Sequence, residues 1–207
     1  MAQPWTAGQG QRTPQQEQFA QAVRDYWSRE RGQTLFTGRP DPLQFFGQAS
    51  GVNSGQKAGD VRVIEAQSIF VLVISLGGFN RVNGAPNGWD IIAFRLGLLI
   101  PALVHDMANT NTQPGPYGPL PTPHEVSGKL RDWYAERIQP FEESWILKGG
   151  AQKQQQLLIS SQGHWTNSVQ SYFAAQSQQQ QALAASNAAG AGRAGSSNVP
   201  GQQDAAP

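Results

Sequence analysis

The chain has 207 residues and a formal net charge of +1, with 15 Lys and Arg against 14 Asp and Glu, and it contains no cysteine. This length accommodates one domain of ordinary size with extensions. Because the charge is balanced, we expect no strong electrostatic attraction to nucleic acid or to an anionic membrane. The lack of cysteine excludes disulfides, thiolate metal sites and a cysteine nucleophile. The N-terminal residues have neither a basic start nor an apolar core, so we expect no signal peptide and synthesis in the cytoplasm.

The first predicted element is a helix that follows a flexible N-terminus of residues 1–12, which is rich in Gly, Gln and Pro. Thr13 is a suitable cap, Pro14 suits the first helical position, and Gln16 completes a capping box. Apolar residues then recur at helical spacing as far as Trp27, which predicts one buried face. Gly32 is the expected stop.

Residues 33–59 have a mixed composition. A turn at residues 39–42 places Asp41 where it can cap a short helix that carries Leu43, Phe45 and Phe46. The segment 47–59 is rich in Gly and Ser, which is typical of a flexible connector.

The two most apolar segments are residues 61–76 and 89–104, separated by a polar loop rich in Gly and Asn. We expect them to form an apolar helical hairpin over about 60–107. The many β-branched residues of the first segment favour a strand, whereas its length, the cap at Asp60 and the glycines at its end favour a helix. Both segments are shorter than the roughly 20 residues of a membrane span and carry charges.

A second capping box, with Thr122 and Glu125 around Pro123, predicts another helix after an extended proline-rich connection. Pro140 should break or bend that helix, and the charged part of the chain ends near residue 148. We therefore expect a helical domain over residues 13–148.

The C-terminal region is almost free of charge, since only Lys153, Arg193 and Asp204 follow residue 148. Its composition predicts a Gln/Ala-rich helical arm over residues 149–186, with a break near Gly163, and a disordered tail over residues 187–207. Two series within the arm have seven-residue spacing, which indicates a thin heptad-like seam: Leu158, Trp165, Tyr172 and Gln179 form one, and Gln162, Val169, Gln176 and Leu183 form the other. The apolar members Leu158, Trp165, Val169, Tyr172 and Leu183 are the candidate interaction residues.

The sequence carries no phosphate-binding loop, nucleophile elbow or metal-ligand spacing, so we expect no catalytic residue, cofactor or metal. His105 and Asp106 are the best candidates for an alternative, hydrolase-like enzyme. Arg95 lies among apolar residues and either pairs with Glu65 on the first apolar segment or faces water.

These features predict a mainly α-helical protein that acts as a non-catalytic structural or interaction subunit of a larger assembly, such as a virion or a secretion machine. Its polar extensions would contact other protein subunits in a homo- or hetero-oligomer, without nucleic acid. An alternative is a membrane-active protein whose apolar hairpin, residues 61–104, inserts into a bilayer.

Overall fold

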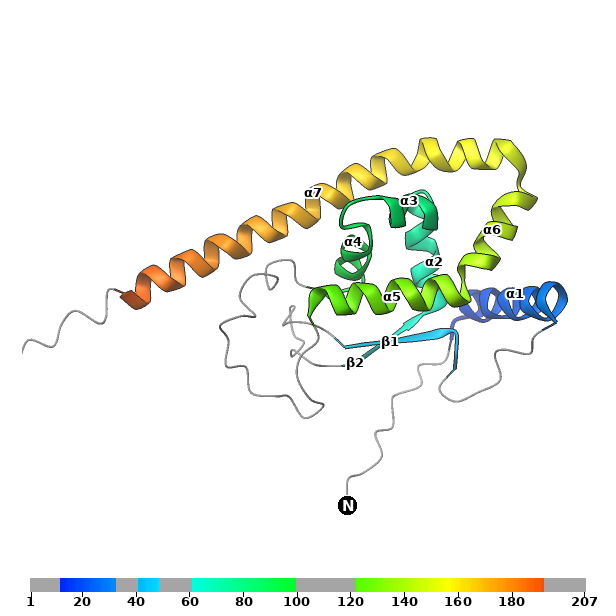
Figure 1. Ribbon diagram of the computed structural model, residues 1–207, viewed down its shortest axis with the longest axis horizontal. Coiled ribbons are helices and arrows are strands. Elements are labelled where there is room, and N and C mark those ends of the chain that lie inside the picture. Colours follow the sequence, from blue (N-terminus) through cyan, green and yellow to red (C-terminus); the bar gives the residue numbers. More distant parts are fainter. Residues whose placement is uncertain (1–11, 33–40, 49–60, 100–121, 192–207) are drawn as a thin grey trace, which may run out of the picture.

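The computed structural model describes residues 12–32, 41–48, 61–99 and 122–191, and it confirms a mainly α-helical chain (Figure 1). Seven helices and one two-stranded antiparallel sheet make up these residues. In chain order the elements are α1 (Pro14–Arg31), β1 (Gln44–Gln48), β2 (Val61–Glu65), α2 (Ala66–Ser75), α3 (Phe79–Gly84), α4 (Gly88–Arg95), α5 (Pro123–Arg137), α6 (Gln139–Lys148) and α7 (Gly150–Ala191). Elements α1 to α6, with β1 and β2, are called the body below.

The two predicted capping boxes are confirmed. The Thr13 hydroxyl accepts a hydrogen bond from the backbone N–H of Gln16, and the Gln16 side chain accepts one from the Thr13 N–H. Thr122 and Glu125 make the same reciprocal pair at the start of α5. Gly32 ends α1 in the left-handed conformation, with φ of 61°.

The prediction of a short helix after Asp41 is wrong, and so is the prediction that the first apolar segment is helical from its start. Residues 44–48 and 61–65 pair as antiparallel strands, with Phe46 opposite Val63 and Gln44 opposite Glu65. The β-branched residues of the second strand fit this pairing. Asp41 instead accepts a hydrogen bond from the Leu43 backbone N–H at 2.9 Å, which closes a turn before β1.

The two-rod apolar hairpin is replaced by three short helices. The first apolar segment becomes helical only from Ala66, where β2 runs directly into α2. Gly77 and Gly78, with φ of 102° and 88°, end α2, and α3 occupies part of the predicted polar loop. The second apolar segment is helical only as far as Arg95, and residues 100–107 lie outside the described residues.

The predicted break at Pro140 is confirmed, because α5 ends at Arg137 and α6 begins at Gln139. The indole N–H of Trp27 on α1 donates to the carbonyl of Arg137 at 3.0 Å. This bond uses a C-terminal carbonyl of α5 that has no partner within its own helix.

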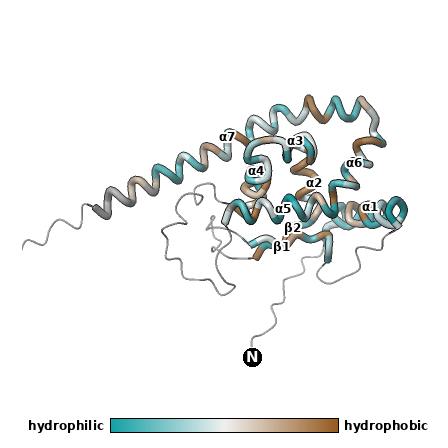
Figure 2. Tube along the Cα trace, viewed as in Figure 1, coloured by the Kyte–Doolittle hydropathy of each residue, from teal (hydrophilic) through white to brown (hydrophobic). Residues whose placement is uncertain are grey.

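The hydrophobic core lies between the body helices and the inner face of the sheet. Figure 2 shows hydrophobic residues along α2, and hydrophilic stretches alternating with apolar ones along α7. Aromatic rings link the elements: Phe45 of β1 meets Trp133 of α5 at a centroid distance of 5.6 Å, and Phe70 of α2 meets Phe141 of α6 at 5.8 Å. The largest fully buried side chains include Leu43, Ile69, Leu76, Ile92, Leu130, Tyr134 and Ile138.

Helix α7 is continuous, so the predicted break near Gly163 is wrong. It runs for 42 residues from Gly150 to Ala191, five residues beyond the predicted end of the arm. One glycine costs a helix about 1 kcal/mol, and the neighbouring Gln, Ala, Ser and Leu residues sustain the helix across it. Of the predicted flexible N-terminus, residues 1–12, all but Arg12 lie outside the described residues, as do residues 192–207 of the predicted tail.

Candidate functional site

A sharp corner separates α6 from α7 (Figure 1), and Gly149 and Gly150 follow the last residue of α6. Gly150 has φ of 68°, a conformation that strongly favours glycine. The Lys153 ammonium lies 3.1 Å from the centroid of the Trp145 ring and donates to the Trp145 carbonyl at 3.2 Å. These contacts tie the first turn of α7 to α6.

One face of α7 packs on the body. Its members are Ser161, Trp165, Ser168 and Tyr172, which recur every three or four residues and so share one side of the helix. Ser161 and Ser168 are both buried. Arg81 on α3 donates a hydrogen bond to Ser161 and places its guanidinium 5.9 Å from the Trp165 ring centroid.

Tyr172 is the last buried residue of this face among the described side chains of α7. It is buried and meets the Phe94 ring of α4 edge to face, at a centroid distance of 5.7 Å. Burial, together with the negative charge of Asp90, raises the pKa of the Tyr172 phenol to about 12. The side chain is therefore a neutral anchor at all physiological pH values.

The structure separates the five candidate interaction residues. Trp165 and Val169 pack partly against the core of the body, and Tyr172 belongs to that core. Leu158 is 56% exposed. Leu183 lies within α7, but its side chain is outside the described part of the chain. The role of these residues in binding another chain stays a prediction.

The predicted Arg95–Glu65 ion pair is wrong. Arg95 is exposed, as in the alternative reading, and its Nη1 donates to the Ser168 hydroxyl at 3.4 Å. Glu65 instead accepts from Arg12 Nε at 2.7 Å and from the Gln44 amide at 2.6 Å. Arg12 also lies 2.8 Å from Asp41, so its guanidinium bridges two carboxylates.

Glu142 is the most deeply buried charged residue of the body, at 2% exposure, and the sequence did not predict its burial. Its Oε1 accepts from the Phe79 backbone N–H, at the start of α3, at 2.7 Å. Its Oε2 accepts from the Tyr134 hydroxyl at 2.5 Å. Desolvation outweighs these two hydrogen bonds and raises the pKa of the Glu142 carboxyl. Both donors lie far from Glu142 along the chain or on another helix, so only the fold reveals the site.

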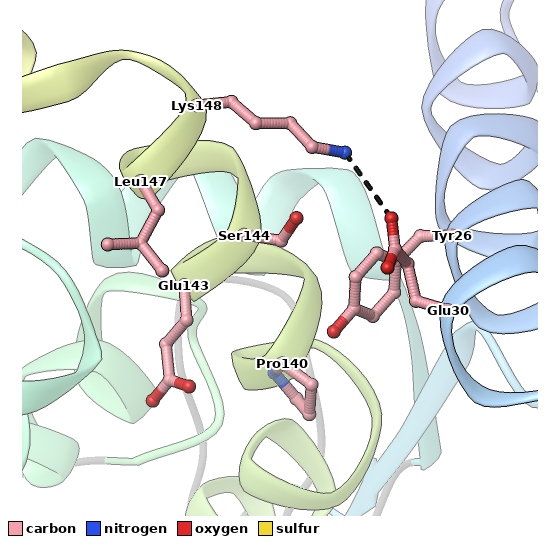
Figure 3. A pocket seen from close by; sticks show the side chains of 7 residues that line it. All are labelled: Tyr26, Glu30, Pro140, Glu143, Ser144, Leu147 and Lys148. Atoms are coloured by element: carbon pink, nitrogen blue, oxygen red, sulfur yellow. Dashed lines mark ion pairs between the residues drawn. The ribbon is translucent and has the colours of Figure 1, made fainter.

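A groove of about 440 Å³ lies between α1 and α6 (Figure 3). Its charged groups each have a partner: Lys148 lies 3.8 Å from Glu30, and Glu143 accepts from the Gln139 amide at 2.8 Å. The groove therefore presents no convergent set of free catalytic groups. It is lined by Tyr26, Glu30, Pro140, Glu143, Ser144, Leu147 and Lys148.

In the described part of the chain, no three His, Asp or Glu side chains converge on a point that could hold a metal ion. None of the described helices combines the length and the hydropathy needed to cross a bilayer. The alternative catalytic pair, His105 and Asp106, lies outside the described residues.

Comparison with known protein families, curated proteins and solved structures found no match to this chain.

Proposed function

We propose that this protein is a non-catalytic interaction subunit of a larger protein assembly, of the kind found in virions and secretion machines, and that α7 is its contact element. The observation that carries this proposal is the length of α7 beyond Tyr172. Tyr172 is the last buried residue among the described side chains of α7, yet the helix continues to Ala191. That continuation, residues 173–191, extends about 28 Å at 1.5 Å per residue. Figure 1 shows it projecting past the body helices.

The composition of α7 supports a protein partner. The helix contains one charged residue, Lys153, in its 42 positions. Soluble surfaces normally carry about a quarter to a third of charged residues, whereas the centres of protein interfaces are depleted of them. A projecting helix without charges thus has the composition of a surface that other protein chains cover.

The test compares the native mass of three forms in the organism that makes the protein: the full chain, a chain that ends at Tyr172, and a control chain that ends at Ala191. The full and control chains should migrate well above the 22.4 kDa of one chain. The form that ends at Tyr172 should migrate as a monomer while its body keeps its helical circular dichroism. If the full chain itself migrates as a monomer in fresh extract, the proposal is wrong.

A further inference from the structure

Helix α7 carries a second stripe of residues on its flank, next to the docked face. Gln162, Val169 and Gln176 are seven residues apart, and Ile159, Thr166 and Phe173 form a second series. The two series alternate at spacings of three and four, which is the a and d pattern of a coiled coil. We call these six residues the outer seam.

The outer seam is largely accessible. Ile159 and Phe173 are 67% and 45% exposed, large values for apolar side chains. Gln162 and Thr166 are exposed and Gln176 is half-buried, while Val169 lies at the border with the docked face and packs partly against the body. At 100° per residue, the seam lies about a quarter turn around the helix from Ser161, Ser168 and Tyr172. The helix can therefore keep its own body docked while its outer seam binds a partner.

We infer that the outer seam pairs with the same seam of a second copy of this chain, as a parallel two-helix coiled coil. This inference rests on the proposed function of α7 as a contact element, and it names the partner.

Charge favours a second copy. No charged residue occurs in α7 after Lys153, so two copies face no like-charge repulsion along the seam, and a charged partner helix would find no complementary charge. Glutamine amides both donate and accept hydrogen bonds, so Gln162 and Gln176 can each pair with their own copies.

The order of residues along the seam favours the parallel direction. In a parallel pair, Phe173 meets Phe173 and Gln176 meets Gln176. In the antiparallel pair centred between Thr166 and Val169, Phe173 would meet Gln162 and Ile159 would meet Gln176. That arrangement buries each large apolar side chain against an amide, which leaves hydrogen-bonding groups without partners. Polar residues at a positions select direction and register in this way.

Single cysteines test the pairing directly, because the chain has no cysteine of its own. In a parallel pair of Gln176→Cys chains, the two Cα atoms of residue 176 should lie within the separation of about 4.4–6.8 Å that a disulfide requires. Gln178→Cys is the matched control, with the same residue type on the opposite, exposed side of the helix. Under mild oxidation of the purified full chain, Gln176→Cys should give a covalent dimer on a non-reducing gel, and Gln178→Cys should stay largely monomeric.

Sedimentation of the cysteine-free chain provides the second readout. The unmodified chain should form a dimer, and Phe173→Glu should weaken the dimer about tenfold or more because it places two carboxylates opposite each other. Equal cross-linking of the two cysteine variants overturns the inference. A purified chain that sediments as a monomer at all concentrations also overturns it. In that case, loss of the native complex on truncation at Tyr172 would still support the proposed function, so the two failures are distinguishable.

Discussion

Replacement of Glu142 by alanine should destabilise the body far more than the same change one residue later. The substitution leaves the Phe79 N–H and the Tyr134 hydroxyl buried without their acceptors, which are now 2.7 and 2.5 Å away. Each unsatisfied donor costs about 1–3 kcal/mol, so the free energy of unfolding should fall by about 2–6 kcal/mol. Glu143→Ala, on the exposed neighbour, should change it by less than about 0.5 kcal/mol.

Urea unfolding followed by tryptophan fluorescence and circular dichroism measures both variants. The pH dependence adds an independent check, because burial raises the pKa of the Glu142 carboxyl above its ordinary value of 4.5. The folded chain then holds this proton more tightly than the unfolded chain does. The contribution of Glu142 to stability is therefore greatest below pH 4.5 and declines as the pH rises through the raised pKa. Glu142→Gln, which stays neutral, should remove this decline. Equal losses in the two alanine variants, or an unchanged pH profile in Glu142→Gln, would refute the reasoning.

Three further substitutions follow from the packing. Gly163→Ala should raise the helicity of α7 and stabilise it by about 1 kcal/mol, measured by circular dichroism, because open space surrounds this position. Gly47→Ala should cost about 1–3 kcal/mol in urea unfolding, because the added methyl would lie 2.7 Å from Leu98 Cδ2; an unchanged midpoint would contradict the close approach. In an alkaline titration of phenolate absorbance, Tyr172 should ionise only near pH 12, and Asp90→Asn should lower that value; ionisation near the ordinary value would show that Tyr172 is exposed.

The parts of the fold that sequence reasoning predicted correctly depend on local chemistry. The caps at Thr13 and Thr122 and the break at Pro140 each involve groups within four residues of one another. Such contacts form in the same way in any surrounding structure, so the residue pattern is sufficient to predict them.

The predictions that proved wrong concern structure that depends on residues distant in the sequence. The strand at Val61–Glu65 forms because residues 44–48 pair with it, and no local pattern records that partner. Glu65 is unavailable to Arg95 because Arg12, 53 positions earlier, already binds it. The heptad spacing in α7 is visible in the sequence. Only the contacts with Arg81 and Phe94 show that one of the two series packs on the body.

The corner at Gly150 and the contacts of α3 together fix the direction in which α7 projects. Glu142 holds the start of α3 to α6, and Arg81 on α3 holds Ser161 on α7. Because α6 continues directly into α7, the three helices form a closed triangle. A helix of 42 residues is about 63 Å long, so a pivot of about 10° at its base would carry the far end about 11 Å. The angle between successive units of anything built on α7 therefore depends on a few side chains of the body, and Arg81→Ala should alter the shape of such an assembly without touching its contacts.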